Sequence, residues 1–198
     1  MLKRSVSIKD TLAQRYIEEH RRIEAEYVPA SLHFLPHAYN HTADGFFPAM
    51  IAPINSVDAE VIAAHVTFLD PKTGNKLKGD GIKSRLIFGS CRGGAIRLSG
   101  ATDRLALCEG IEDGLTILST TDWPVWVTGG TSNLRSVELP DSIREVLIGA
   151  DNDQAGLEAT QHLAKRLTKE GRMVRIATPP SGYKDFNAML CGEKHHVA

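Results

Sequence analysis

The chain contains 198 residues with a formal net charge of −1; 42% of them are apolar and 24% are charged. Such a composition suits one globular domain of ordinary size or two small ones, and it excludes disordered and collagen-like chains. No apolar run approaches the roughly 18 residues of a membrane helix, and the first residues lack the apolar core of a signal peptide. We therefore expect a cytoplasmic protein that makes no contact with a membrane.

Charge is sorted along the chain. Residues 72–104 contain eight basic and two acidic residues, whereas residues 105–198 contain nine basic and thirteen acidic residues. The chain as a whole is therefore not a polycation that binds nucleic acid regardless of shape. The three cysteines, Cys91, Cys108 and Cys191, lie far apart in the sequence, so we expect reduced thiols.

The first half of the chain begins with a predicted helix, because apolar side chains between residues 8 and 27 recur at the spacing of one helical face. Short runs rich in β-branched and aromatic residues follow at 46–54, 61–70 and 83–90, with a turn sequence at 70–75. We predict a small α+β subdomain over residues 1–101, made of this helix and an antiparallel sheet.

From residue 102 onward, apolar runs alternate with helical patterns. The apolar runs cover residues 104–110, 124–130, 145–151 and 173–180, and the predicted helices cover 112–121, 131–137 and 154–171. Apolar strands that alternate with helices indicate a parallel sheet covered on both faces. In the last helix an apolar stripe recurs every fourth residue, at Ala155, Ala159, Leu163 and Leu167, and Gly171 is placed to end it. We predict an α/β domain over residues 102–192 and a tail at 193–198.

Acidic or polar side chains follow three of these four strands. They are Glu109 and Asp113 after the first, Asp151 and Asp153 after the third, and Lys184, Asp185 and Asn187 after the fourth. Because ligands bind beyond the carboxyl ends of parallel strands, we expect these clusters at one edge of the sheet. Crowded carboxylates are stabilised by protonation or by a cation, and oxygen ligands without His or Cys suit Mg²⁺ or Mn²⁺ together with substrate phosphates.

Single acidic residues also have structural interpretations. Asp153 can be the N-cap of the helix that follows it. Glu109 and Asp113 can be acids favoured near a helix start by the helix dipole. These interpretations explain individual residues but not the occurrence of three clusters together.

The order of the motifs resembles a known family. A strand followed by "EG" and a later Asp, a strand followed by "DND" and a later Gly, and finally "KD" resemble the Toprim domain shared by DnaG-type primases, type IA and II topoisomerases and some nucleases. The first half resembles primase-like Toprim proteins of phages and mobile elements through "RYI" and "RRI", "PAMIAPI" and "HVTFLDP", and "RLIFGS" and "GGAIRL". The resemblance covers residues 10–192 and implies a Rossmann-like parallel sheet with flanking helices.

The resemblance also implies roles for individual residues. Glu109 takes the place of the Toprim glutamate, and Asp151 and Asp153 take that of the metal-binding pair. Asp113 matches a second acid of primases, and Asp185 matches the first acid of their last motif. We therefore expect the catalytic residues to be Glu109, Asp113, Asp151 and Asp153. The expected metal ligands are Glu109, Asp151, Asp153 and Asp185.

The sequence departs from the family pattern in two places. Asn187 stands where primases often have another acid, which implies that one metal site is weaker or lost. No cysteine-rich zinc module precedes Ile8, and no Walker-type or helicase segment follows Cys191. The chain thus resembles a primase catalytic core that would rely on a separate helicase or zinc-binding template-recognition module.

Five basic residues are candidates for contacts with nucleic acid or nucleotide: Lys83, Arg85, Arg92, Arg97 and Lys184. They can follow a template backbone or hold a triphosphate. Alternating Lys and Arg are also the ordinary solvent face of an antiparallel sheet, and both interpretations remain open.

The resemblance predicts primase-like nucleotidyl transfer, which is the synthesis of an RNA primer on single-stranded DNA from nucleoside triphosphates with Mg²⁺ or Mn²⁺. The expected setting is replication of phage, plasmid or mobile-element DNA. Two alternatives fit the same fold: a Toprim metal-dependent nuclease, and a replication accessory or DNA-binding module without turnover. A topoisomerase is not expected, because the chain is too short to add a DNA-cleavage domain and gate.

Overall fold

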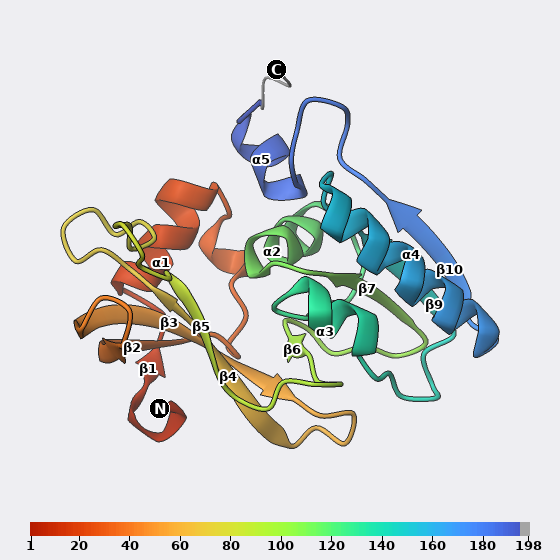
Figure 1. Cartoon of the computed structure of the whole chain (residues 1–198), viewed down its shortest axis with the longest axis horizontal. Coiled ribbons are helices and arrows are strands. Elements are labelled where there is room, and N and C mark those ends of the chain that lie inside the picture. Colours follow the sequence, from red (N-terminus) through yellow and green to blue (C-terminus); the bar gives the residue numbers. More distant parts are fainter. Residues whose placement is uncertain (195–198) are drawn as a thin grey trace.

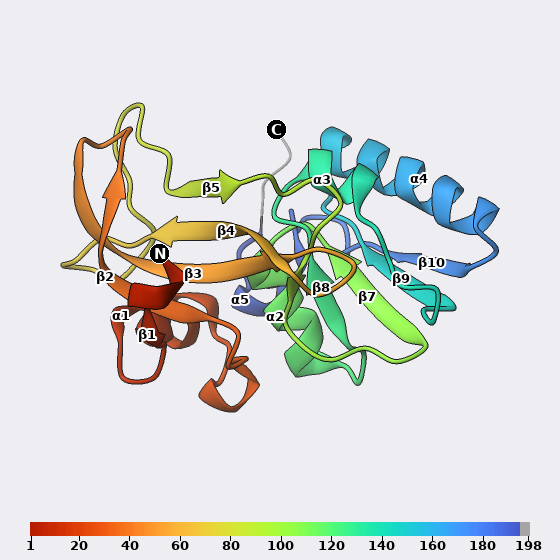
Figure 2. The same cartoon turned by 90° about the horizontal axis from the view of Figure 1, so that it is seen from below.

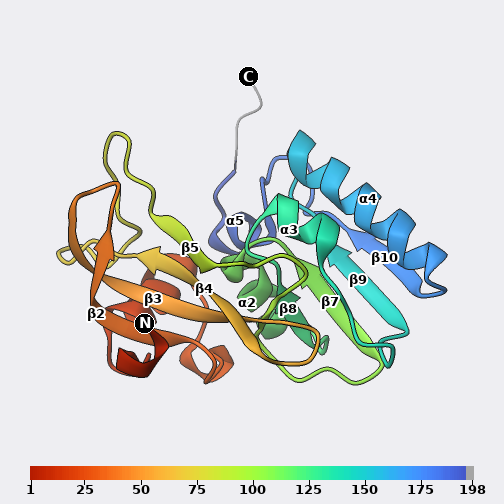
Figure 3. The same cartoon turned by 60° about the horizontal axis from the view of Figure 1, so that its bottom comes forward.

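The computed structural model describes residues 1–194 and contains two five-stranded sheets (Figure 1). Strands between residues 6 and 89, coloured red to yellow, form one sheet, and strands between residues 96 and 177, coloured yellow-green to blue, form the other; we call these parts of the chain the first and the second half. The sheets lie side by side in both rotated views (Figure 2, Figure 3). Residues 1–194 contain no helix with the length and apolar character of a membrane span.

The sheet of the first half is antiparallel, with the strand order β1-β2-β3-β4-β5. Its strands are β1 (Val6–Ser7), β2 (His33–Asn40), β3 (Gly45–Asn55), β4 (Val61–Phe68) and β5 (Arg85–Gly89). The predicted strands at 46–54, 61–70 and 83–90 are confirmed. Strand β2 is not predicted from the sequence, because Pro36 and a register shift between Leu35 and Ala38 interrupt its alternation of buried and exposed residues.

The predicted helix over residues 8–27 is wrong in its extent. A 3-10 turn, η1 (Leu2–Arg4), begins the chain, and helix α1 (Leu12–Arg15) continues into a π-helical turn, η2 (Tyr16–His20); a separate 3-10 turn, η3 (Ala25–Tyr27), follows. Arg22 adopts a φ of 56° and so ends the helix. The carbonyl oxygen of Arg21 accepts hydrogen bonds from the side chains of Asn187 and Cys191. These distant partners fix the helix end, and no local periodicity reports them.

The sheet of the second half has the strand order β10-β9-β7-β8-β6. Strands β7 (Arg104–Cys108), β8 (Val125–Val127), β9 (Glu145–Gly149) and β10 (Met173–Ala177) are parallel, and the short β6 (Ile96–Arg97) pairs antiparallel with β8. The helices are α2 (Ile111–Thr120), α3 (Thr131–Ser136), α4 (Gln154–Lys169) and α5 (Phe186–Cys191). The four predicted strands and three predicted helices of this half are confirmed.

Helices cover both faces of the parallel sheet. On one face, Ala159, Leu163 and Leu167 of α4 are fully buried with Leu134 of α3, whereas Ala155 is exposed. On the other face, α2 packs against β7 and β8, and α5 packs against α2. The predicted stripe on α4 is therefore confirmed for three of its four residues, and Gly171 follows the helix end with a φ of 82°.

One hydrophobic core runs from the antiparallel sheet to the α2 face of the parallel sheet. Tyr16 and Ile17 of the N-terminal helix, Met50 of β3, and Ile111 and Leu115 of α2 belong to this single buried cluster. The two halves therefore pack as one body. The predicted boundary between residues 101 and 102 remains a prediction, and residues 195–198 of the predicted tail lie outside the described residues.

Candidate active site

The three acidic clusters lie beyond the carboxyl ends of β7, β9 and β10, which are neighbours in the sheet. From β7 the chain continues to β8 on one side and later returns to β9 on the other side of β7. Such a switch point leaves a crevice at the carboxyl edge of a parallel sheet, because the connections diverge there. A pocket of about 210 Å³ lies at this edge.

Residues of opposite charge line this pocket, and they come from different halves of the chain. The acidic residues are Glu109, Glu112, Asp113, Asp151, Asp153, Asp185 and Glu193. The basic residues are Arg21, Lys76, Arg85 and Lys184. All the acids belong to the second half, whereas three of the four basic residues belong to the first. The packing of the two sheets therefore adds three basic side chains to an edge where the second half supplies the acids and only Lys184.

The three residues of the "DND" turn after β9 make different contacts. Asp151 lines the pocket, and its Oδ1 atom is buried without a hydrogen-bond partner in residues 1–194. The Asn152 N–H donates to the carbonyl of Lys184 at 2.7 Å, which ties the turn to the loop after β10. Asp153 Oδ1 accepts from the Gly156 N–H at 2.8 Å and so caps α4. The structural interpretation of Asp153 is thus confirmed, and the same residue also lines the pocket.

Helix α5 attaches to α2 through Asp113. The Asp113 Oδ1 atom accepts from the backbone N–H of Asn187 at 2.9 Å. The side-chain amide of Asn187 donates to the Arg21 carbonyl at 3.0 Å and to Thr116 Oγ1 at 3.1 Å. Asp185 caps α5 by accepting from the Ala188 N–H at 2.7 Å. Asn187 therefore joins three segments of the chain, although it also lines the pocket.

Burial and crowding raise the pKa of three pocket acids. Burial, followed by the charges of Asp185 and Asp151, raises the pKa of Asp113 to about 8. Burial and then the charge of Glu109 raise the pKa of Asp151 to about 7. Burial and then the charge of Asp153 raise the pKa of Glu109 above its ordinary value. The site holds more negative charge than its surroundings compensate, which favours protonation or a cation.

The donor atoms at this edge fit a hard divalent cation. They are carboxylate oxygens, and the buried Oδ1 of Asp151 lacks any partner in the described residues. No group of three or more His, Cys, Asp or Glu side chains in residues 1–194 is already arranged around one ion position. Mg²⁺ requires no such cage, since it is held by one or two carboxylates together with waters and substrate phosphates.

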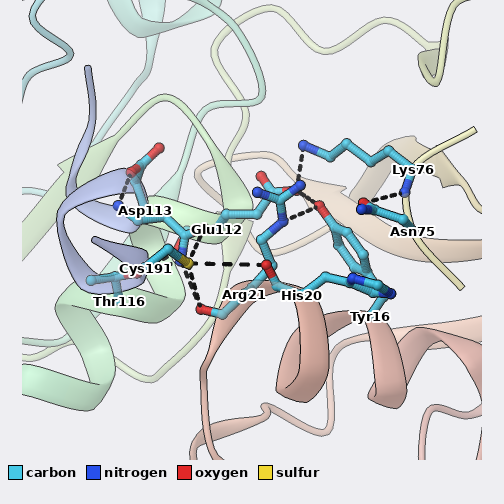
Figure 4. Close-up of polar contacts among 10 residues, drawn as sticks. Tyr16, His20, Arg21, Asn75, Lys76, Glu112, Asp113, Thr116 and Cys191 are labelled. Atoms are coloured by element: carbon cyan, nitrogen blue, oxygen red, sulfur yellow. Dashed lines mark hydrogen bonds and ion pairs between the residues drawn. The ribbon is translucent and has the colours of Figure 1, made fainter. Parts of the chain in front are cut away.

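Glu112 fixes two of the basic residues at the pocket (Figure 4). Its Oε1 atom accepts from the Tyr16 hydroxyl at 2.5 Å and lies 2.7 Å from Lys76 Nζ. The Arg21 Nε–H donates to the Tyr16 hydroxyl at 2.9 Å. Burial alone raises the pKa of Glu112, but Lys76 and the Tyr16 hydrogen bond outweigh it and hold that pKa well below its usual range. Glu112 is therefore an anion that orients cations of the first half.

Arg21, Lys76 and Glu112 are not predicted from the sequence. Arg21 belongs to the "RRI" motif and Glu112 precedes Asp113 in "EGIED". These neighbouring motifs are the sequence features from which the two residues could have been predicted. Lys76 has no local signal, because it follows a turn and reaches Glu112 only through the packing of the two halves.

Two of the five predicted basic residues line the pocket. Arg85 and Lys184 face the carboxylates there. Lys83 and Arg92 are exposed and, in the part of the chain that the structure describes, do not line this pocket. Their role in binding nucleic acid remains a prediction.

Arg97 makes structural contacts away from the pocket. Its guanidinium stacks over the Trp126 ring at 4.3 Å from the ring centroid and donates to the carbonyls of Ser56 and Val57. These contacts join the β3–β4 hairpin to the parallel sheet. No contact in residues 1–194 favours the predicted phosphate-binding role of Arg97.

Two family models match the chain. A domain of unknown function (DUF7146) matches residues 1–98, and a Toprim domain matches residues 104–194. No curated protein matches the chain.

Solved primase structures are similar in fold. The primase fragment of the bacteriophage T7 primase-helicase protein has a TM-score of 0.62 and 22% identity, covering 88% of this chain and 69% of that one. The Aquifex aeolicus primase, with its zinc binding and RNA polymerase domains, has a TM-score of 0.67 and 17% identity, covering 94% and 54%. The DnaG primase catalytic domain bound to single-stranded DNA has a TM-score of 0.61 and 16% identity, covering 94% and 70%. At such identities the likeness establishes the fold, and the chain spans about half the length of the Aquifex structure.

Proposed function

We propose that this chain, which contains a Toprim domain and has the fold of a primase catalytic core, carries out primase-like nucleotidyl transfer. It would synthesise an RNA primer on single-stranded DNA from nucleoside triphosphates. The supporting observation is the pocket at the sheet edge, where carboxylates of the second half face Arg21, Lys76 and Arg85 of the first half. Carboxylates suit a divalent cation and the basic residues suit phosphates, so the pocket suits a nucleotide with its metal.

Mg²⁺ or Mn²⁺ would be held by Asp151 and Asp153 after β9, together with Glu109 after β7 or Asp185 after β10. The unpartnered Oδ1 of Asp151 is the donor that most needs such a ligand. When bound with a nucleotide, the ion would neutralise the charge that develops on the phosphate under attack.

The chain's own residues would bind the triphosphate and move the proton. Arg85 and Lys184 line the pocket from different halves of the chain, and a guanidinium matches two phosphate oxygens at once. Glu109 would accept the proton of the 3′ hydroxyl as that oxygen bonds to the α-phosphorus and pyrophosphate leaves, because a carboxylate at the pocket can act as a general base. Asp113 would support this arrangement by holding α5 at the pocket through Asn187.

The partners follow from the same proposal. The T7 structure is a fragment of a primase-helicase protein, the Aquifex structure includes zinc binding domains, and the DnaG structure holds single-stranded DNA. We extend these properties to the present chain as a single-stranded DNA template and a separate helicase or zinc-binding module. The setting would be cytoplasmic replication of phage, plasmid or mobile-element DNA.

A priming assay tests the proposal. The protein is incubated with single-stranded templates, the four ribonucleotides and Mg²⁺ or Mn²⁺, and we expect short RNA products. Asp151→Asn should reduce their yield about 100-fold or more, on the scale of removing one group that stabilises developing charge. Asp141→Asn, at an exposed turn remote from the pocket, is the matched control. Absence of product with every template and both ions would contradict autonomous priming.

The same assay separates the two alternatives. A Toprim nuclease would use the same carboxylates to activate water, so it would degrade the template, and Asp151→Asn would stop the degradation. A binding module without turnover would give no product, and Asp151→Asn would leave its DNA binding unchanged.

A further inference from the structure

A second pocket of about 200 Å³ opens beside the pocket at the sheet edge, which contains Glu109, Asp151 and Asp185 and which we call the carboxylate pocket. It lies between strands β4 and β5 of the antiparallel sheet and the turns that follow β7 and β8 in the parallel sheet. Arg85, Glu109, Gly110 and Glu112 line both pockets. A ligand whose phosphates lie in the first pocket can therefore extend into the second.

His65 of β4 lines this second pocket, which we call the His65 pocket. The side chain belongs to a residue that is only 5% exposed, and its Nδ1 atom is buried without a hydrogen-bond partner in the described residues. A buried polar atom without a partner destabilises a fold, so such atoms usually have a further explanation. Packing alone does not supply one, since an apolar side chain would fill the same place without that penalty.

Burial lowers the pKa of His65 to about 4. The imidazole is therefore neutral near pH 7 and has one donor and one acceptor nitrogen. A neutral imidazole is poorly suited to bind a phosphate group, because it lacks the positive charge of a side chain such as Arg85, which lines the same pocket. It is well suited to a hydroxyl, carbonyl or amine group of an uncharged ring.

The remaining walls of the pocket favour such a ring. Leu86, Ile87 and Ile111 are apolar, and Gly110 and Gly129 contribute backbone without side chains. At about 200 Å³ the pocket is smaller than those that enclose a whole drug-sized ligand, and it suits one part of a larger ligand. Away from Arg85, Glu109 and Glu112, which it shares with the other pocket, the lining is apolar apart from the neutral His65, and this combination matches the flat faces and polar edge of a nucleoside.

We propose that the His65 pocket binds the nucleoside part of a nucleotide whose triphosphate lies among Arg85, Lys184 and the carboxylates, with His65 hydrogen-bonding to that nucleoside. The inference rests on the proposed function for the position of the triphosphate. It adds the place where the uncharged part of the substrate is recognised, and it makes the antiparallel sheet a direct part of the substrate site.

Binding measurements with and without the nucleoside test this inference. Each of ATP, GTP, CTP and UTP is titrated into the protein with Mg²⁺ in parallel with inorganic tripolyphosphate, which can occupy only the carboxylate pocket. We expect at least one nucleotide to bind about tenfold more tightly than tripolyphosphate. His65→Phe, which keeps a ring but removes both nitrogens, should lose about tenfold in affinity for that nucleotide, the scale of one hydrogen bond, and should bind tripolyphosphate as the unchanged protein does.

His162 provides the matched control, because it is exposed on α4 and does not line the His65 pocket. His162→Phe should change neither affinity. If His65→Phe does not fold, the inference can be tested on the unsubstituted protein by NMR. The imidazole nitrogen resonances of His65 should shift when the nucleotide is added and should not shift when tripolyphosphate is added.

Two results would overturn the inference: equal affinities of the unchanged protein for all four nucleotides and tripolyphosphate, or equal weakening of both kinds of ligand by His65→Phe. Failure of the proposed function looks different. In that case primer synthesis is absent while the nucleotide still binds more tightly than tripolyphosphate through His65.

Discussion

Asp113 has a more strongly raised pKa than Asp151, so its ionisation destabilises the folded state more. Its pKa is raised from 3.8 to about 8, first by burial and then by neighbouring carboxylates. The folded chain therefore binds more protons than the unfolded chain between about pH 4 and about pH 8. The contribution of Asp113 to the free energy of unfolding is therefore greatest below this window and is lost as the pH rises through it.

The direction in which the free energy of unfolding changes with pH can be measured by urea unfolding in EDTA at about pH 5 and about pH 9. We expect the free energy of unfolding to decrease by a few kcal/mol over this range. Asp113→Asn keeps an oxygen that can accept the Asn187 N–H but has no titratable group, so much of the decrease should disappear; Asp151, with a pKa of about 7, accounts for the remainder. The exposed Asp141→Asn serves as control, and an unchanged pH dependence in Asp113→Asn would refute the assignment.

The start of α4 shows how one element serves both the fold and the site. Asp153 caps the helix through the Gly156 N–H and also lines the carboxylate pocket. Gly156 leaves room for this turn, because a Cβ atom at this position would lie 3.1 Å from the Cβ and the carbonyl oxygen of Asp151. The turn that ends β9 thus places two carboxylates at the site with little room for change.

Two substitutions separate the roles of Asp153. Asparagine is as good an N-cap as aspartate, so Asp153→Asn should leave the free energy of unfolding nearly unchanged, whereas Asp153→Ala should lower it by about 1 kcal/mol. Both variants lose the carboxylate and should lose primer synthesis to a similar extent. Full activity of Asp153→Asn would mean that Asp153 is a helix cap alone.

The elements of the second half could be predicted because each carries its own pattern. An apolar strand such as Val125–Val127 or Glu145–Gly149 is recognisable without its neighbours, and the carboxyl ends of parallel strands must meet at one edge. That rule is enough to bring Glu109, Asp151 and Asp185 together. The prediction of one helix over residues 8–27 was wrong because the observed helix end depends on hydrogen bonds from α5, which no local sequence pattern shows.

The basic side of the site depends on the packing of the whole molecule. Tyr16 and Glu112 are 96 residues apart in the sequence and form one buried hydrogen bond. Lys76 joins the same carboxylate from a turn beyond β4. No rule of strand order or spacing brings these residues together, so the sequence predicts the carboxylates that follow the parallel strands but neither Glu112 nor the basic residues Arg21 and Lys76.

The Lys76–Glu112 pair connects the two halves and should be sensitive to the loss of either charge alone. Its side chains are 20% and 10% exposed, and removal of one partner leaves the other charge buried without compensation. We expect Glu112→Gln to lower the free energy of unfolding by roughly 3–5 kcal/mol, and the further change Lys76→Met to restore much of that loss. Chemical denaturation of the single and double variants measures both effects.

An exposed ion pair provides the comparison. Arg15 and Glu19 have side chains that are 52% and 53% exposed, so Glu19→Gln should cost less than about 1 kcal/mol. An equally small effect of Glu112→Gln would show that the buried pair is unimportant for stability.

In the proposed function, carboxylates of the second half and basic residues of the first half bind one nucleotide together with a divalent cation. The most direct test is a crystal structure of the protein with Mn²⁺ and a non-hydrolysable nucleoside triphosphate, in which anomalous scattering locates the ion. We predict an ion within about 2.0–2.5 Å of an Asp151 carboxylate oxygen and of a phosphate oxygen, with Arg85 against the triphosphate. A nucleotide bound elsewhere on the molecule, or an ion remote from Asp151, would contradict the claim.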